Sequence, residues 1–248
     1  MQQQAQLDSE FDALSLRSSM WKDLEEGSAK LRCRSCENAK VIYIQKQNGK
    51  EEPPWDLWAY IFQWLGPAPS ALGMQGPPKT EKTKWRVFWF PADVKRQYPS
   101  QGEKVGPASL NGGYSYPCHN DMIVIYRMEE ATRVLIHEIL HASCCDPQGA
   151  SLPMKEANTE TWAEIFLVAI LSKGSEREAQ RLWQLQSQWI ANQNAILRNK
   201  YNVQTPNDYA WRYTLGREEI LHSLKIDLPE AKNTRTLSSR LTSPEVYP

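Results

Sequence analysis

The chain has 248 residues, and its 29 lysine and arginine side chains balance 29 aspartate and glutamate side chains, so its formal net charge is zero. This length is enough for one large domain or two small ones, and enough to bury a substantial core. The balance excludes a general electrostatic hold on nucleic acid or on an anionic membrane, and leaves room only for a local basic patch. Because no apolar run is long enough to span a bilayer and the polar N-terminus does not resemble a secretory signal, we expect an intracellular protein.

The cysteines are few, and their arrangement is informative. An odd number of five with one adjacent pair does not indicate a disulfide framework, so a reducing setting is expected. Cys33-Arg-Ser-Cys36 is a C-x-x-C pair. Such a pair could be a redox pair, or it could supply half of the ligands of a zinc site. No second pair of cysteine or histidine ligands follows at zinc-finger spacing, which argues against a structural zinc there.

The first half of the chain alternates polar and apolar segments. Residues 1–40 are polar and predicted to be partly disordered, although a short helix around 14–31 is compatible with them. Residues 53–66 start with two prolines and end at a glycine, with apolar residues at helical spacing, so they predict a helix. The stretch 67–83 is rich in Pro, Gly, Lys and Thr and predicts a long loop. The aromatic and β-branched run 84–91 predicts a buried strand.

The second half changes from strands to helices. Residues 111–116 and 122–126 predict a hairpin. Everything after it is expected to be helical, over residues 129–145, 155–172, 175–200 and about 206–224. The predicted fold is therefore α+β, with a small N-terminal sheet region packed on a mainly helical C-terminal half and the helix 129–145 between them. We expect one domain over residues 41–226 and a polar tail over 227–248.

One motif carries chemistry. His137-Glu138-Ile-Leu-His141 is H-E-x-x-H, and residues four apart lie on one face of a helix, about one pitch apart. Two imidazoles at this spacing can share one tetrahedral zinc ion. Glu138 lies beside them, where it can take a proton from a water on the open metal position as general base.

The residues around the motif favour this interpretation over two chance histidines in a core. Burying an ionisable glutamate in such a helix without a charged partner costs several kcal/mol, and a zinc ion is such a partner. The apolar residues that make the helix buried nearly all round are Val134, Leu135, Ile136, Ile139 and Leu140.

Several residues could in principle complete the metal site. The metzincin pattern requires a glycine and a third ligand where this chain has Cys144 and Pro147, so that pattern fails. Asp146 lies near the end of the same helix and would need a sharp turn to reach back. His222 lies far away and is better explained as a surface or core histidine. Carboxylates remain on the following predicted helix.

Glu160 follows His141 after eighteen intervening residues, and the resulting H-E-x-x-H-x18-E pattern resembles the gluzincin zinc peptidases, which include thermolysin and zinc aminopeptidases. The resemblance covers about residues 110–170 and extends to Glu164, one turn further along. It implies one zinc ion per chain on His137, His141 and Glu160, and substrate bound in extended form on the preceding hairpin. The G-x-M-E-N stretch of the aminopeptidases is missing, which argues against that branch.

The resemblance implies a zinc metallopeptidase that acts on a peptide or protein substrate. Glu138 would activate water, and Glu164 would either bind a histidine ring N–H or replace Glu160 as the ligand. The family usually supplies a tyrosine or histidine for the oxyanion, and Tyr209 and Tyr213, one turn apart, are candidates. For each tyrosine taken singly, packing of an aromatic side chain in a helical core is the simpler explanation.

Three alternatives stay open. H-E-x-x-H also occurs in some zinc amidases and esterases. A binding module with a structural zinc would fill the open position with Asp146 or Cys145, and a protein without metal would use the motif for packing alone. The sequence does not distinguish endopeptidase from exopeptidase action, and it does not indicate which substrate side chain is preferred.

Overall fold

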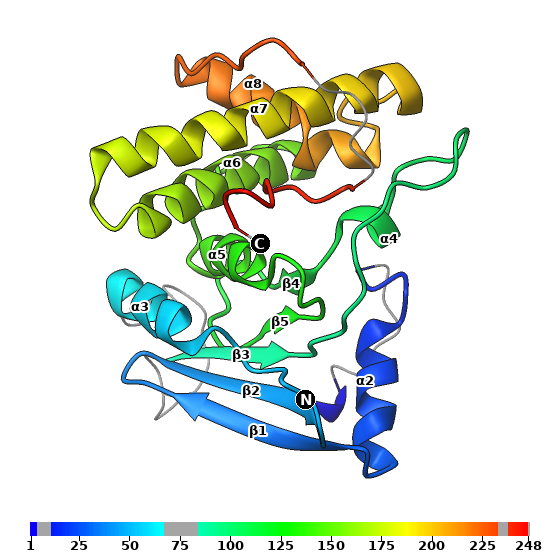
Figure 1. Cartoon of the computed structure of the whole chain (residues 1–248), viewed down its shortest axis with the longest axis vertical. Helices are drawn as coiled ribbons and strands as arrows, with labels where there is room; N and C mark the ends of the chain where they lie inside the picture. Colours follow the sequence, from blue (N-terminus) through cyan, green and yellow to red (C-terminus); the bar gives the residue numbers. More distant parts are fainter. Residues whose placement is uncertain (4–10, 67–83, 233–237, 248) are drawn as a thin grey trace. The chain divides into compact units, whose positions relative to one another are not determined.

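The chain folds into two compact units (Figure 1). The computed structural model describes residues 1–3, 11–66, 84–232 and 238–247. The first unit comprises Met1–Val94 and Gly112–Cys145, and the second comprises Lys95–Asn111 and Asp146–Pro248. A five-stranded sheet lies in the first unit and most of the helices lie in the second, which confirms the α+β fold class. The predicted loop 67–83 lies outside the described residues.

The sheet of the first unit is mixed, with the strand order β1-β2-β3-β5-β4. Its outer pairs, β1 with β2 and β4 with β5, are antiparallel, whereas β2 and β5 both run parallel to β3. The pairing of β4 with β5 confirms the predicted hairpin, and β3 confirms the predicted strand 84–91. The strands are β1 (Ala29–Ser35), β2 (Ala39–Lys46), β3 (Trp85–Trp89), β4 (Gly113–Ser115) and β5 (Ile123–Ile125).

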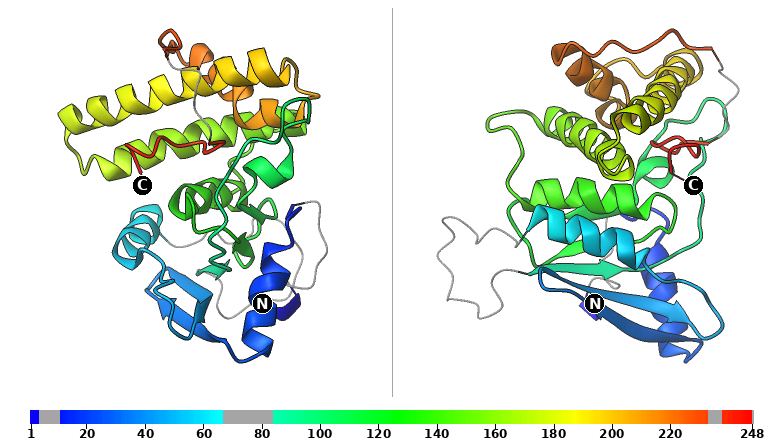
Figure 2. Two further views of the ribbon diagram at one scale, coloured as in Figure 1. Left: turned by 45° about the vertical axis from the view of Figure 1, so that its right-hand side comes forward. Right: turned by 60° about the vertical axis from the view of Figure 1, so that its left-hand side comes forward.

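Two helices cover one face of this sheet. The predicted helix 53–66 is confirmed as α3 (Trp55–Leu65), which connects the parallel strands β2 and β3, and α5 (Ala131–Ala142) follows β5 (Figure 2). The ring of Trp58 packs at 5.5 Å from that of Trp89 in β3, and its Nε1 donates to Thr132 Oγ1 of α5 at 2.9 Å. The indole therefore ties both helices to the sheet, with its only polar atom satisfied.

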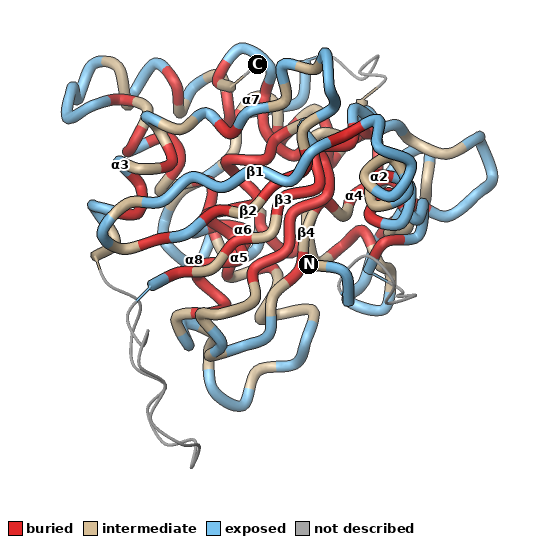
Figure 3. Tube along the Cα trace, turned by 90° about the horizontal axis from the view of Figure 1, so that it is seen from below, coloured by how far each residue is buried: buried red, intermediate tan, exposed pale blue. Residues whose placement is uncertain are grey.

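The opposite face is covered by α2 (Leu16–Glu25). Ile44 of β2 packs there with Leu16 and Met20 of α2, whereas the neighbouring Tyr43 contacts Trp89 on the other face. This alternation follows from the two-residue period of a strand, and β3 alternates between buried and partly buried residues along its length (Figure 3). Both α2 and β1 lie entirely within the polar N-terminal 40 residues.

The second unit is built from α6 (Leu152–Leu171), α7 (Glu176–Tyr201) and α8 (Leu215–Ser223), with the short elements α4 (Pro107–Leu110) and η1 (Tyr209–Tyr213). The predicted helices 155–172 and 175–200 are confirmed as α6 and α7. The helix predicted over 206–224 is instead divided into η1 and α8, because Thr214 between them has φ −137° and ψ −86°, outside the helical region.

The C-terminal residues of the second unit are bound along α7. Gln186 Nε2 donates to the carbonyl of Leu241 at 3.0 Å, and Trp189 Nε1 and Gln193 Nε2 both donate to the carbonyl of Arg240. Leu241 and its neighbours are buried. Nothing in the described part of the chain combines the helix length and apolar character needed to cross a membrane.

Candidate metal centre

Helix α5 carries the motif and is buried along its whole length, as its apolar sequence predicts. It packs against β4 and β5 of the sheet. Gly113 of β4 permits this close approach, because a Cβ added there would lie 2.6 Å from Val134 Cγ1 of the helix and 2.6 Å from the carbonyl oxygen of Val124. The hairpin and the motif helix are thus one packed element within the first unit.

His137 and His141 point the same way from α5, as their four-residue spacing predicts. Their Nε2 atoms lie 3.0 Å apart, and the two rings meet nearly edge to face. Two nitrogens bound to one tetrahedral zinc at about 2.05 Å would lie about 3.3 Å apart, so small adjustments of the rings would suit the ion. Both side chains are buried.

The carboxylate of Glu138 is bound by a residue of the hairpin. Ser115, the last residue of β4, has its Oγ 2.8 Å from Glu138 Oε2 and 3.0 Å from the backbone carbonyl oxygen of Glu138. The hydroxyl has one proton, which it can donate to either acceptor. Donation to the carboxylate would orient the side chain of Glu138. The motif alone gave no indication of this contact, since 23 positions separate the two residues.

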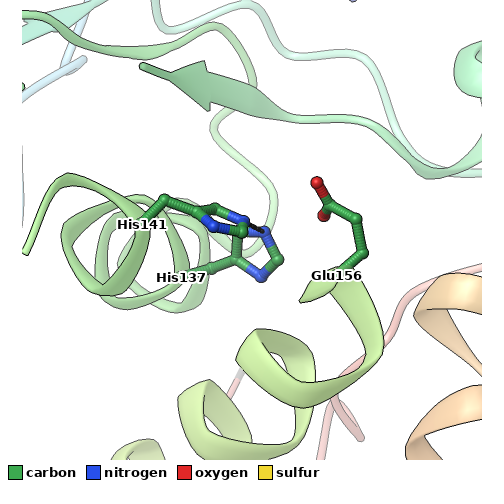
Figure 4. A group of neighbouring side chains, drawn as sticks. All are labelled: His137, His141 and Glu156. Atoms are coloured by element: carbon green, nitrogen blue, oxygen red, sulfur yellow. Dashed lines mark hydrogen bonds between the residues drawn. The ribbon is translucent and has the colours of Figure 1, made fainter. Parts of the chain in front are cut away.

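One carboxylate joins the histidines in the group that could hold a metal ion. Single ligand atoms of His137, His141 and Glu156 all lie within 4.8 Å of one another (Figure 4). Two imidazole nitrogens and a carboxylate oxygen are the donor set that zinc accepts in proteins. Glu156 begins the run of acidic residues on α6 and had not been predicted as a ligand.

The two predicted carboxylates of α6 lie one and two turns beyond Glu156. Glu160 is fully buried, and its role as the third ligand stays a prediction. Glu164 is also buried, and its Oε2 lies 3.4 Å from Arg217 Nη1 of α8. The hydroxyl of Thr242 lies 3.4 and 3.3 Å from its two oxygens. The carboxylate of Glu164 is therefore part of a buried ion pair within the second unit.

The two candidate tyrosines lie together in η1. Tyr209 donates its hydroxyl to Asn111 Oδ1 at 2.6 Å, and the hydroxyl oxygens of Tyr209 and Tyr213 are 3.5 Å apart. Burial raises the pKa of Tyr209, and burial together with the charge of Glu156 raises the pKa of Tyr213 well above its usual value. Both phenols therefore stay protonated, as hydrogen-bond donors must.

The cysteines are placed differently from the expectation. Cys118, between β4 and β5, forms a disulfide with Cys144 just after α5, so the expectation of no disulfide is wrong for this pair. An odd count excludes complete pairing but says nothing of which residues the fold brings together. The other three cysteines form no disulfide within the described residues, and Cys33 and Cys145 are exposed. Cys33 and Cys36 belong to no metal-binding group among the described residues.

Comparison of the chain with protein-family models, with curated proteins and with solved structures gave no match. The sequence motif and the geometry of the site therefore carry the functional argument alone.

Proposed function

We propose that the protein is a zinc-dependent metallopeptidase that uses Glu138 as general base. The observation that carries the proposal is the geometry within the first unit. Two ring nitrogens 3.0 Å apart converge on one face of a buried helix, and the intervening glutamate is oriented by a serine of the adjoining hairpin. Two histidines that lay in a core by chance would not require a carboxylate between them, or a hydroxyl group bound to that carboxylate.

The roles of the chain's own side chains follow from these contacts. Bound zinc would supply a Lewis acid that polarises a carbonyl and lowers the pKa of water towards 7. Glu138 would accept the proton of the attacking water and later pass it to the leaving amine. Ser115 would restrict the rotation of the Glu138 carboxylate, so that its other oxygen stays available for the water.

A carboxylate of α6 completes the proposed ligand set. Glu156 is supported by the short distances of the His137/His141/Glu156 group, and Glu160 by the spacing that resembles the gluzincins. Residues four apart lie on one face of a helix, so either carboxylate suits a ligand from that face. We propose that Glu164 is instead structural, because Arg217 and Thr242 already bind its carboxylate.

The first test is elemental analysis of the purified protein and of a His137→Ala/His141→Ala variant. We expect about one zinc per chain in the unaltered protein and almost none in the variant. His222→Ala is the matched control, since this exposed histidine pairs only with Asp227 among the contacts described. Full zinc retention in the double variant would contradict the assignment.

The same measurement identifies the third ligand. Chelator competition with Glu156→Ala and Glu160→Ala in parallel should nearly abolish zinc binding in one variant. Loss of a carboxylate that only orients a ligand should weaken zinc affinity by roughly 10- to 100-fold. Equal small losses in both variants would mean that neither is the ligand.

The catalytic part of the proposal is tested with Glu138→Gln. This substitution preserves shape and removes the base, so peptide hydrolysis should fall by at least about 10²-fold while zinc is retained. Peptide libraries assayed beside simple esters and amides distinguish a peptidase from another zinc hydrolase. Unchanged turnover of every substrate by Glu138→Gln would show that the motif is not catalytic.

A further inference from the structure

The first strand of the sheet has an open edge. β1 is the outermost strand and, among the residues that the structure describes, pairs only with β2; six of its seven residues are exposed (Figures 1 and 3). The side chains of β1 are exposed on both faces of the strand. Leu31, an apolar residue, has 49 % of its surface accessible. The opposite edge of the sheet is β4, which belongs to the candidate metal centre, so β1 is a separate surface.

The register shows which backbone groups face outward. The amide of Cys36 donates to the carbonyl of Ala39, and the amide of Gln47 donates to the carbonyl of Ser28, at the two ends of the β1–β2 pair. In an antiparallel ladder the directly bonded positions alternate, so the even-numbered residues of β1 bond to β2. The amides and carbonyls of Leu31, Cys33 and Ser35 therefore point out of the open edge.

The side chains of β1 make this edge positively charged. Lys30, Arg32 and Arg34 alternate along the strand and thus share one face, about 6.7 Å apart, while no residue of β1 is acidic. Arg34 is paired with exposed Glu52 at 3.1 Å. An exposed pair of this kind contributes little, so another carboxylate can replace Glu52 without a large loss.

These charges also decide what the edge can accept. A second copy of β1 would bring Lys and Arg side chains opposite one another, which is unfavourable for directly opposed strands. An incoming antiparallel strand would exchange hydrogen bonds at Leu31, Cys33 and Ser35. Its residues opposite the three basic side chains would then occupy the non-bonded positions, where cross-strand side chains come closest.

We propose that β1 binds an extended acidic segment of a partner protein as an added antiparallel strand. The segment would carry Asp or Glu at three alternate positions, to face Lys30, Arg32 and Arg34. Apolar residues between them would lie on the face of Leu31. Main-chain hydrogen bonds would supply affinity, and the alternating charges would supply specificity and register. This surface does not depend on whether the metal centre binds zinc.

The test is fluorescence anisotropy with the full-length protein and a labelled peptide of alternating Glu and Val, Glu-Val-Glu-Val-Glu-Val-Glu. Replacing every Glu with Gln should weaken binding at least fivefold at low salt, and added salt should reduce that difference because the charges are exposed. Mass spectrometry after the titration confirms that the peptide stays intact.

The peptide itself provides the control for strand pairing. N-methylation of the central Val removes an amide that would point at β1, and should weaken binding about fivefold to tenfold, the equivalent of roughly one hydrogen bond. N-methylation of a Glu, whose amide would point away from β1, should change the affinity by less than about twofold. This pair of peptides requires no change to the protein.

Charge-reversal variants of the protein test whether the peptide binds at β1. Arg32→Glu should weaken binding of the acidic peptide at least fivefold. Arg177→Glu, an equal change of charge at an exposed arginine of the second unit, should leave the affinity for the peptide unchanged. Three results would overturn the proposal: no binding at millimolar peptide, equal effects of the two N-methyl groups, or equal affinity for the Gln peptide. Displacement of the peptide by a single-stranded oligonucleotide that binds more tightly would also overturn it, because the basic side chains would then bind phosphate.

Discussion

We propose that Glu164 is a structural carboxylate and not a metal ligand, and the cost of removing it can be calculated. Its side chain is 1 % exposed and that of Arg217 is 0 % exposed, and the guanidinium of Arg217 also reaches the carbonyl of Leu241 and Oε1 of Gln193. Truncation to alanine would leave the guanidinium buried without its carboxylate. Breaking a buried pair in this way typically costs about 3–5 kcal/mol. At about 2–4 °C per kcal/mol for a protein of this size, the thermal midpoint should fall by about 10 °C.

The assay combines thermal unfolding with zinc analysis. We expect Glu164→Ala to lower the midpoint and to retain its zinc at saturating metal. The double variant Glu164→Leu/Arg217→Met should recover much of the lost stability, since an apolar pair of similar volume often replaces a buried ion pair without loss. An unchanged midpoint together with complete loss of zinc would refute this reasoning and make Glu164 the ligand.

Three further changes probe the fold. The disulfide closes a loop of 26 residues, so Cys118→Ser should lower the free energy of unfolding by about 3.5 kcal/mol, while Cys145→Ser should have no effect in chemical denaturation. Gly216→Ala would place a Cβ 2.6 Å from the Trp211 ring and should cost about 1–3 kcal/mol in the same assay. Burial raises the pKa of Tyr114 to about 12, so its neutral form is favoured in the fold and stability is lost as pH rises from about 10 to 12. In pH-dependent unfolding, Tyr114→Phe should make that alkaline loss less steep.

The elements that the sequence predicted well have strong local patterns. The apolar run around His137 and His141 is long and has the helical period, so both α5 and the shared face of the histidines could be predicted. The strands β4 and β5 were recognisable from short apolar and aromatic runs separated by a turn. Local periodicity and turn chemistry are enough for such elements because neighbouring residues determine them.

Other features depend on distant partners. β1 is exposed along nearly its whole length, so it lacks the alternation of a half-buried strand and was not distinguished from a polar segment. Its stability comes from pairing with β2, whose own apolar residues face two different layers. The disulfide likewise joins Cys118 to Cys144 because the hairpin folds back on α5, which cysteine spacing does not reveal.

The acidic residues of α6 show that sequence spacing alone does not identify which carboxylate binds a metal ion. Glu156, Glu160 and Glu164 recur every four residues, so they share one helix face and present the same local pattern. Tertiary contacts distinguish them. Glu164 is bound by Arg217, 53 positions later in the chain, and by Thr242, 78 positions later. Glu156, in contrast, lies near Tyr213, whose pKa is raised first by burial and then by the negative charge of Glu156. The charge of Glu164 is already compensated by the buried guanidinium of Arg217, and this electrostatic environment supports the proposed structural role of Glu164.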